Sequence, residues 1–164
     1  MSSPKEDGAM ERSPQTDAFA DTEDFVTFTI ANQLFGIPVL KVQDVLSSHN
    51  ITRIPLAPPE IAGSLNLRGR IVTAMDVRLR LGLPPREQRS NMSIVAEHEG
   101  ELYSLMVDSV GEVLALKGAD WERNPPTLDP KFRDYSLGIY RLDDKLLVVL
   151  DVNRLLDYDR VQAA

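Results

Sequence analysis

The feature that most constrains the fold is an internal repeat. Residues 63–81 read GSLNLRGRIVTAMDVRLRL, and residues 138–156 read GIYRLDDKLLVVLDVNRLL. At a constant offset of 75 positions the first glycine, the leucine before the turn, the aspartate, the valine after it and the last leucine coincide. Each copy predicts two strands joined by a turn, then a short helix capped by the aspartate.

A weaker repeat has an offset of 68. It sets Phe35 and residues 42–46 (VQDVL) beside Tyr103 and residues 110–114 (VGEVL). The alternative to duplication is chance, because strand–aspartate–helix units tend to look alike. If the repeat is a duplication, the body consists of two similar β-rich lobes. Five short strands per lobe fit a partly closed barrel, which removes strand edges from solvent. The prediction is two small barrels that share a core.

The two ends of the chain differ in character. Residues 1–23 are rich in Ser, Pro, Asp and Glu, which is typical of a disordered acidic tail. Order is expected to begin near Phe25, and residues 24–160 are predicted to form one domain of two pseudo-repeated barrel subdomains.

Three local segments need separate predictions. Residues 42–46 fit either a strand or a short helix, because periodicity alone does not separate the two. Residues 51–54 are predicted to form a short strand that Pro55 ends. Residues 118–134 are predicted to be irregular, with Trp121 in the core.

The turns of the two repeated hairpins carry opposite charges. One has Arg68-Gly69 at its tip and the other has Asp143-Asp144. Gly69 suits a tight turn that requires positive φ. Arg68 is not required by the turn, where Asn or Asp would fit better, so it is either an ordinary surface cation or a contact for a partner.

Composition excludes several classes of protein. The chain of 164 residues is 43% hydrophobic and has no cysteine, so disulfides and thiolate metal sites are excluded. No apolar run reaches the length of a membrane span, and the N-terminus lacks the apolar segment of a secretion signal. We expect a cytoplasmic protein without direct membrane insertion.

The net charge of −7 is unevenly distributed. Residues 50–90 carry seven arginines against three acidic residues, giving +4. A nucleic-acid-binding barrel that uses the basic block from Arg53 to Arg80 is therefore the alternative function. The acidic balance of the whole chain argues against it, since phosphate-backbone binding needs a dominant positive surface.

No catalytic or metal-binding pattern stands out. His49 and His98 are predicted in surface turns, and the segment from His98 to Glu101 does not match a metal-ligand spacing. Helix capping explains Asp76 and Asp151. We expect no enzyme activity, no cofactor and no metal.

Several motifs together resemble the chemotaxis coupling protein family, CheW. They are Asn66-Leu-Arg-Gly69 followed by Met75-Asp-Val-Arg78, residues 35–45 (FGIPVLKVQDV), residues 51–55 (ITRIP), residues 107–110 (VDSV) and residues 150–155 (LDVNRL). Their order and spacing are kept over roughly residues 24–158, which makes the signal specific.

The resemblance implies a fold and a function. The fold is mainly β, with two intertwined five-stranded SH3-like β-barrel subdomains and a few short helices. The function is that of a non-catalytic adaptor between the cytoplasmic tip of a chemoreceptor and the regulatory domain of a CheA-type histidine kinase. We expect a cytoplasmic monomer that is recruited to membrane-associated receptor arrays.

The resemblance also assigns a receptor-binding surface. Carried over residue by residue, it comprises Val42, Asp44, Arg68 and Gly69. Asp44 stands where Glu is common in the family, which shortens its reach by one methylene. No motif of comparable sharpness marks the kinase-binding residues, so these stay unassigned.

Overall fold

The computed structural model describes residues 21–47, 50–85 and 92–157. The predicted tail at 1–23 therefore lies almost wholly outside the described residues. The first strand begins at Thr22, slightly before Phe25, where order was expected to begin.

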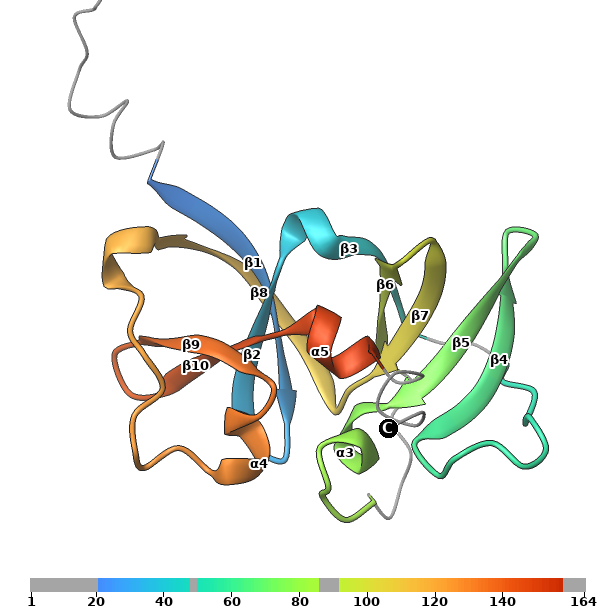
Figure 1. The fold of residues 1–164 in the computed structure, drawn as a ribbon. Helices are drawn as coiled ribbons and strands as arrows, with labels where there is room; N and C mark the ends of the chain where they lie inside the picture. Colours follow the sequence, from blue (N-terminus) through green and yellow to red (C-terminus); the bar gives the residue numbers. More distant parts are fainter. Residues whose placement is uncertain (1–20, 48–49, 86–91, 158–164) are drawn as a thin grey trace, which may run out of the picture.

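The described strands form two five-stranded sheets that lie side by side (Figure 1). Lobe 1 has the order β8-β1-β2-β10-β9, and lobe 2 has the order β3-β6-β7-β5-β4. The strands are β1 (Thr22–Ile30), β2 (Gln33–Pro38), β3 (Val42–Leu46), β4 (Ile61–Leu67), β5 (Arg70–Asp76), β6 (Ser93–His98), β7 (Glu101–Met106), β8 (Ser109–Lys117), β9 (Ser136–Arg141) and β10 (Leu146–Leu150). The helices are η1 (Val39–Lys41), α3 (Val77–Arg80), η2 (Gly118–Asp120), α4 (Pro130–Arg133) and α5 (Val152–Leu156). The predicted mainly β fold, with two intertwined five-stranded units and a few short helices, is confirmed.

Each lobe takes strands from both halves of the chain. The chain forms β1 and β2 in lobe 1, crosses to lobe 2 for β3 to β7, and returns to lobe 1 for β8 to β10. In the first half of the chain, β1 and β2 lie in lobe 1 and β3 to β5 lie in lobe 2. In the second half, β6 and β7 lie in lobe 2 and β8 to β10 lie in lobe 1. Helix α5 lies between the two sheets in Figure 1.

The strand register of the two lobes is the same once the two offsets are applied. In lobe 1 the parallel pair β2–β10 sets Leu34 opposite Leu147. In lobe 2 the parallel pair β7–β5 sets Leu102 opposite Val72. Residues 34 and 102 differ by 68, and residues 72 and 147 differ by 75, so both offsets read from the sequence relate equivalent structural positions.

The edges of each sheet are brought together by contacts outside the named strands. In lobe 2, Thr52 and Ser64 exchange backbone hydrogen bonds of 2.7 and 2.8 Å, which tie the β3–β4 connection to edge strand β4. In lobe 1, Glu122 and Ile139 form the equivalent bridge onto edge strand β9. Both sheets therefore curl toward closure, as expected for a small barrel.

The main hydrophobic core is shared between the lobes. Phe28 and Phe35 of lobe 1 stack at 5.6 Å between ring centroids, and Phe132 of α4 meets Phe35 edge-on at 5.3 Å. The same buried cluster includes Met75 and Leu105 of lobe 2. Since burying one large apolar side chain contributes roughly 1.5–3 kcal/mol, the lobes stabilise each other.

Helix capping follows the sequence prediction. Asp76 accepts a hydrogen bond from the backbone N–H of Leu79 at 3.3 Å, and Asp151 accepts one from Arg154 at 3.1 Å. Capping of a helix N-terminus therefore explains both aspartates.

Two local predictions are wrong and one ambiguity is resolved. Residues 42–46 are a strand. Residues 51–54 contain only the bridge at Thr52, since the prolines that follow cannot donate ladder hydrogen bonds. Trp121 is 44% exposed rather than in the core. Its indole N–H donates to the Leu137 carbonyl at 3.1 Å, and the ring lies over Gly138.

Candidate interaction surface

The hairpin between β4 and β5 ends in a two-residue turn. Arg68 has φ +52° and Gly69 has φ +84°, while Leu67 and Arg70 pair on either side. Positive φ at both central residues is the type I′ geometry, which matches the twist of a hairpin. The Asn66 carboxamide oxygen accepts a hydrogen bond from the Gly69 N–H at 3.0 Å and steadies the turn.

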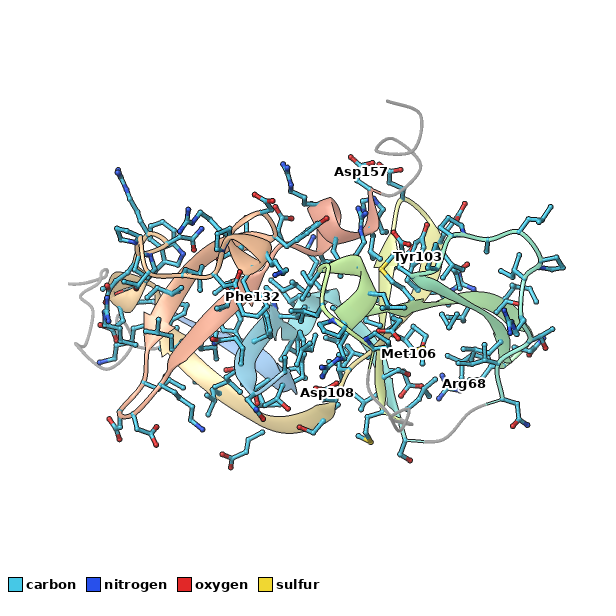
Figure 2. The ribbon with its side chains drawn as sticks, turned by 90° about the horizontal axis from the view of Figure 1, so that it is seen from below. Arg68, Tyr103, Met106, Asp108, Phe132 and Asp157 are labelled. Atoms are coloured by element: carbon cyan, nitrogen blue, oxygen red, sulfur yellow. The ribbon has the colours of Figure 1, made fainter. Side chains whose placement is uncertain are left out.

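The structure brings two of the predicted receptor-binding residues into direct contact. The Arg68 Nη2 donates to the Asp44 Oδ2 at 2.7 Å, which connects the β4–β5 turn to edge strand β3. The Arg68 side chain is 74% exposed and that of Asp44 is 24% exposed. Figure 2 shows Arg68 on lobe 2, well separated from Asp157 at the end of α5. The guanidinium therefore keeps most of its N–H groups available to a partner.

The ion pair sets the protonation state of Asp44. The hydrogen bond from Arg68 lowers the pKa of this carboxyl below its ordinary value of 3.8, and a second hydrogen bond, from the Val45 N–H, lowers it further. The backbone bond is 2.8 Å long. Asp44 is therefore an anion at neutral pH and holds the guanidinium in place.

The other two predicted residues differ in their exposure. Val42 is half-buried on β3 and packs against the main core, so it presents only part of its side chain to a partner. Gly69 is exposed at the tip, and a Cβ added there would meet no atom within 4 Å. A partner can approach the backbone closely at this point.

Two exposed apolar side chains near these residues were missed in the sequence. Ile71 on β5 is 69% exposed, and Val45 on β3 is 41% exposed. The signal was available, because side chains alternate along a strand. Val72 and Ala74 are buried, so Ile71 lies on the opposite face of β5 from these two residues and is mostly exposed.

Two arginines of the basic block serve the fold. Arg78 donates to the Asp108 carboxylate at 2.6 Å, and both side chains are mostly buried. Arg80 donates to the Leu155 carbonyl of α5 at 2.9 Å, and its guanidinium lies 5.4 Å from the Tyr135 ring centroid. Because these two arginines are engaged within the fold, the block offers fewer free cations for phosphate contacts than the nucleic-acid alternative assumes.

The histidine predictions have different outcomes. His49 lies outside the described residues. His98 ends β6 at the turn into β7, but its side chain is only 10% exposed, so the prediction of a surface turn is wrong for the imidazole itself. The ring packs beside Tyr103, with 6.5 Å between centroids.

The described residues include no helix with the length and hydrophobicity of a membrane span.

Comparison with known proteins gives consistent matches. The family model described as a CheW-like domain matches residues 24–160. Chemotaxis protein CheW of Klebsiella aerogenes is 29% identical over 140 residues, which cover 85% of this chain and 84% of that protein. Its counterpart in Helicobacter pylori is 27% identical over 156 residues, which cover 91% and 94%. The crystal structure of the scaffolding protein TtCheW from Thermoanaerobacter tengcongensis matches with a TM-score of 0.74 and 31% identity, covering 84% of this chain and 94% of that one.

Proposed function

The chain belongs to the CheW-like domain family, and on that premise we propose that it is a non-catalytic adaptor that couples chemoreceptors to a CheA-type histidine kinase. The adaptor role agrees with its relatives, which are named as chemotaxis proteins, and with its structural neighbour, a scaffolding protein. The receptor contact would be the cytoplasmic tip of a methyl-accepting chemotaxis protein, and the kinase contact would be the kinase's regulatory domain.

The observation that carries the receptor contact is the exposed ion pair between Arg68 and Asp44. A turn with φ +52° favours Gly, Asn or Asp, yet the chain has a long cation there. Arginine at this position therefore lowers the stability of the turn, and its side chain is 74% exposed. Contact with a partner is the best explanation for such a residue.

The chemistry of this surface suits the end of a helical hairpin. A guanidinium has five N–H donors in a planar fork, which can bind carboxylates or the carbonyl groups left unpaired at helix ends. Asp44 holds the fork in one orientation, so less side-chain entropy is lost on binding. Ile71 on β5 and Val45 on β3 add exposed apolar side chains to the strands next to this pair, and apolar area is a usual part of protein interfaces.

Signal would pass through this chain as geometry rather than as chemistry. The lobes share a core and exchange strands, so a displacement imposed on lobe 2 by a receptor moves the whole body. The protein would act as a cytoplasmic monomer that is recruited to membrane-associated receptor arrays.

The test is a binding comparison of two charge reversals on the same hairpin. Arg68→Glu should reduce capture of the cognate receptor's cytoplasmic fragment by about tenfold or more, because it removes the donor and repels receptor carboxylates. Arg70→Glu is the matched control, an exposed arginine two residues away, and should retain most of the binding.

Thermal melting of both variants separates binding from folding. We expect both to melt close to the unchanged protein, since surface substitutions usually change stability by less than about 0.5 kcal/mol. Equal capture by Arg68→Glu and the unchanged protein would contradict the receptor assignment. Failure of a histidine kinase to co-purify with the tagged chain from its own cells would contradict the adaptor function itself.

A further inference from the structure

Three metal-ligating side chains from distant parts of the sequence meet where the β6–β7 hairpin of lobe 2 faces the end of α5. A ring nitrogen of His98 and one carboxylate oxygen each of Glu99 and Asp157 lie within 4.8 Å of one another. Figure 2 shows Asp157 at the end of α5, beside this hairpin. The site is on the margin of the molecule away from Arg68, so it is separate from the receptor-binding surface.

His98 is the residue that the fold alone does not explain. Its side chain is nine-tenths buried, and its Nε2 is inaccessible to solvent and has no hydrogen-bond partner within the described part of the chain. That nitrogen lies 3.8 Å from Glu99 Oε2, which is too long for a hydrogen bond. A buried polar atom without a partner costs about 1–3 kcal/mol, and it is directed at a carboxylate.

The charge around this nitrogen favours a cation. Four acidic and two basic residues line the depression, which gives a formal charge of −2. The acidic ones are Glu97, Glu99, Asp151 and Asp157, and the basic ones are Lys41 and Arg154.

We propose that His98, Glu99 and Asp157 form a binding site for a divalent first-row transition-metal cation, with Zn²⁺ as the representative ion. One imidazole and two carboxylates are ligands that Zn²⁺ and its neighbours accept, whereas Ca²⁺ and Mg²⁺ prefer oxygen ligands alone. Water would complete the coordination shell.

The spacing requires only a small closure. Ligand atoms about 2.1 Å from a tetrahedral ion are about 3.4 Å apart, so the present separations of at most 4.8 Å must shorten by at most about 1.4 Å. His98 Nε2 and Glu99 Oε2 already lie 3.8 Å apart, and the Glu99 side chain is 69% exposed, so this side chain has room to adjust.

The site would connect the two lobes. His98 and Glu99 belong to the hairpin of lobe 2, while Asp157 follows α5, which continues from β10 of lobe 1. Ligands drawn from both lobes would make bound metal a clamp between them, and metal binding would stabilise the folded chain against unfolding.

The experiment is calorimetric titration of ZnCl₂ into the metal-free full chain, together with its melting temperature. We expect one strong site and a rise in the melting temperature at saturating Zn²⁺. CaCl₂ and MgCl₂ at the same concentrations should give neither. His98→Gln should weaken Zn²⁺ binding at least about tenfold, because even loss of an outer-shell partner of a ligand typically costs that much. His49→Gln removes the chain's other imidazole and should leave the strong site intact.

Two further variants protect the test against a folding defect in His98→Gln. Glu99→Gln changes a mostly exposed group and should weaken binding, while the melting temperature without metal stays nearly unchanged. Asp157→Asn should also weaken binding. Absence of a strong site, or Zn²⁺ affinity that is the same in His98→Gln and Asp157→Asn as in the unchanged chain, would overturn the proposal.

Discussion

Arg78 and Asp108 form an ion pair of 2.6 Å that holds the two lobes in register. Arg78 belongs to α3, which follows β5 of lobe 2, and Asp108 lies on the crossing from β7 to β8. The same Asp108 carboxylate accepts a hydrogen bond of 2.8 Å from the Ala31 N–H in the β1–β2 turn of lobe 1. One carboxylate thus connects three segments that meet at the boundary between the lobes.

Arg78→Ala should destabilise the fold by roughly 2–3 kcal/mol, because it leaves a mostly buried carboxylate without its cation. Chemical denaturation measures this loss. Arg141→Ala is the matched control, since it breaks an exposed ion pair with Glu122 of 3.0 Å and should cost less than about 1 kcal/mol. Similar losses in the two variants would mean that the Arg78 pair is not structural.

Gly63→Ala should be among the most damaging single changes, costing about 3 kcal/mol or more. A Cβ at Gly63 would lie 2.2 Å from the Thr52 carbonyl oxygen, which belongs to the bridge that closes lobe 2. Gly138 is the equivalent residue of lobe 1, where a Cβ would lie 2.1 Å from the Trp121 Nε1.

The control for this prediction is Gly69→Ala. Gly69 also has positive φ, but it has open space around it. Only the backbone strain remains there, so the cost should be about 1–2 kcal/mol. Equal melting temperatures for the variants at Gly63 and Gly69 would contradict the close contact at Gly63.

Arg68→Asn should stabilise the protein while weakening receptor capture. Asparagine tolerates the positive φ of this turn better than arginine does, which is worth about 1 kcal/mol. The lost surface ion pair offsets at most part of this gain. A lower melting temperature in this variant would show that the ion pair with Asp44 serves the fold.

The pH dependence of Asp44 follows from its lowered pKa. A carboxyl whose pKa is lower in the folded state contributes stability that is fully present above its ordinary value of 3.8 and is lost as pH falls through the lowered value. Carboxyl NMR titration should therefore find Asp44 still ionised below pH 3.8. In Arg68→Gln the pKa should rise toward the ordinary value, and an unchanged pKa would show that Arg68 is not its main cause.

The sequence predicted those parts of the structure that depend on local pattern. The aspartates at 76 and 151 were correctly read as helix caps, because a cap depends on a few adjacent residues. The offsets of 75 and 68 held in the strand register, since equivalent strands must place equivalent residues opposite each other.

The features that the sequence did not predict depend on contacts between residues that are far apart in the chain, and one sequence does not reveal such contacts. Nothing in the spacing of Asp44 and Arg68 indicated that they would be ion-paired. The placement of Asp157 beside His98 is also a result of the exchange of strands. Trp121 was misplaced because an aromatic residue in an irregular segment can as well cover a glycine at the surface as enter the core.

The crossing of the chain between sheets has a mechanical consequence. Among the described residues, neither those before residue 86 nor those from 92 to 157 contain the strands of a complete sheet. A load applied at one end cannot open one sheet while the other stays folded, because each half of the polypeptide is anchored in both. Strand exchange of this kind therefore favours a body that resists bending between its two sheets.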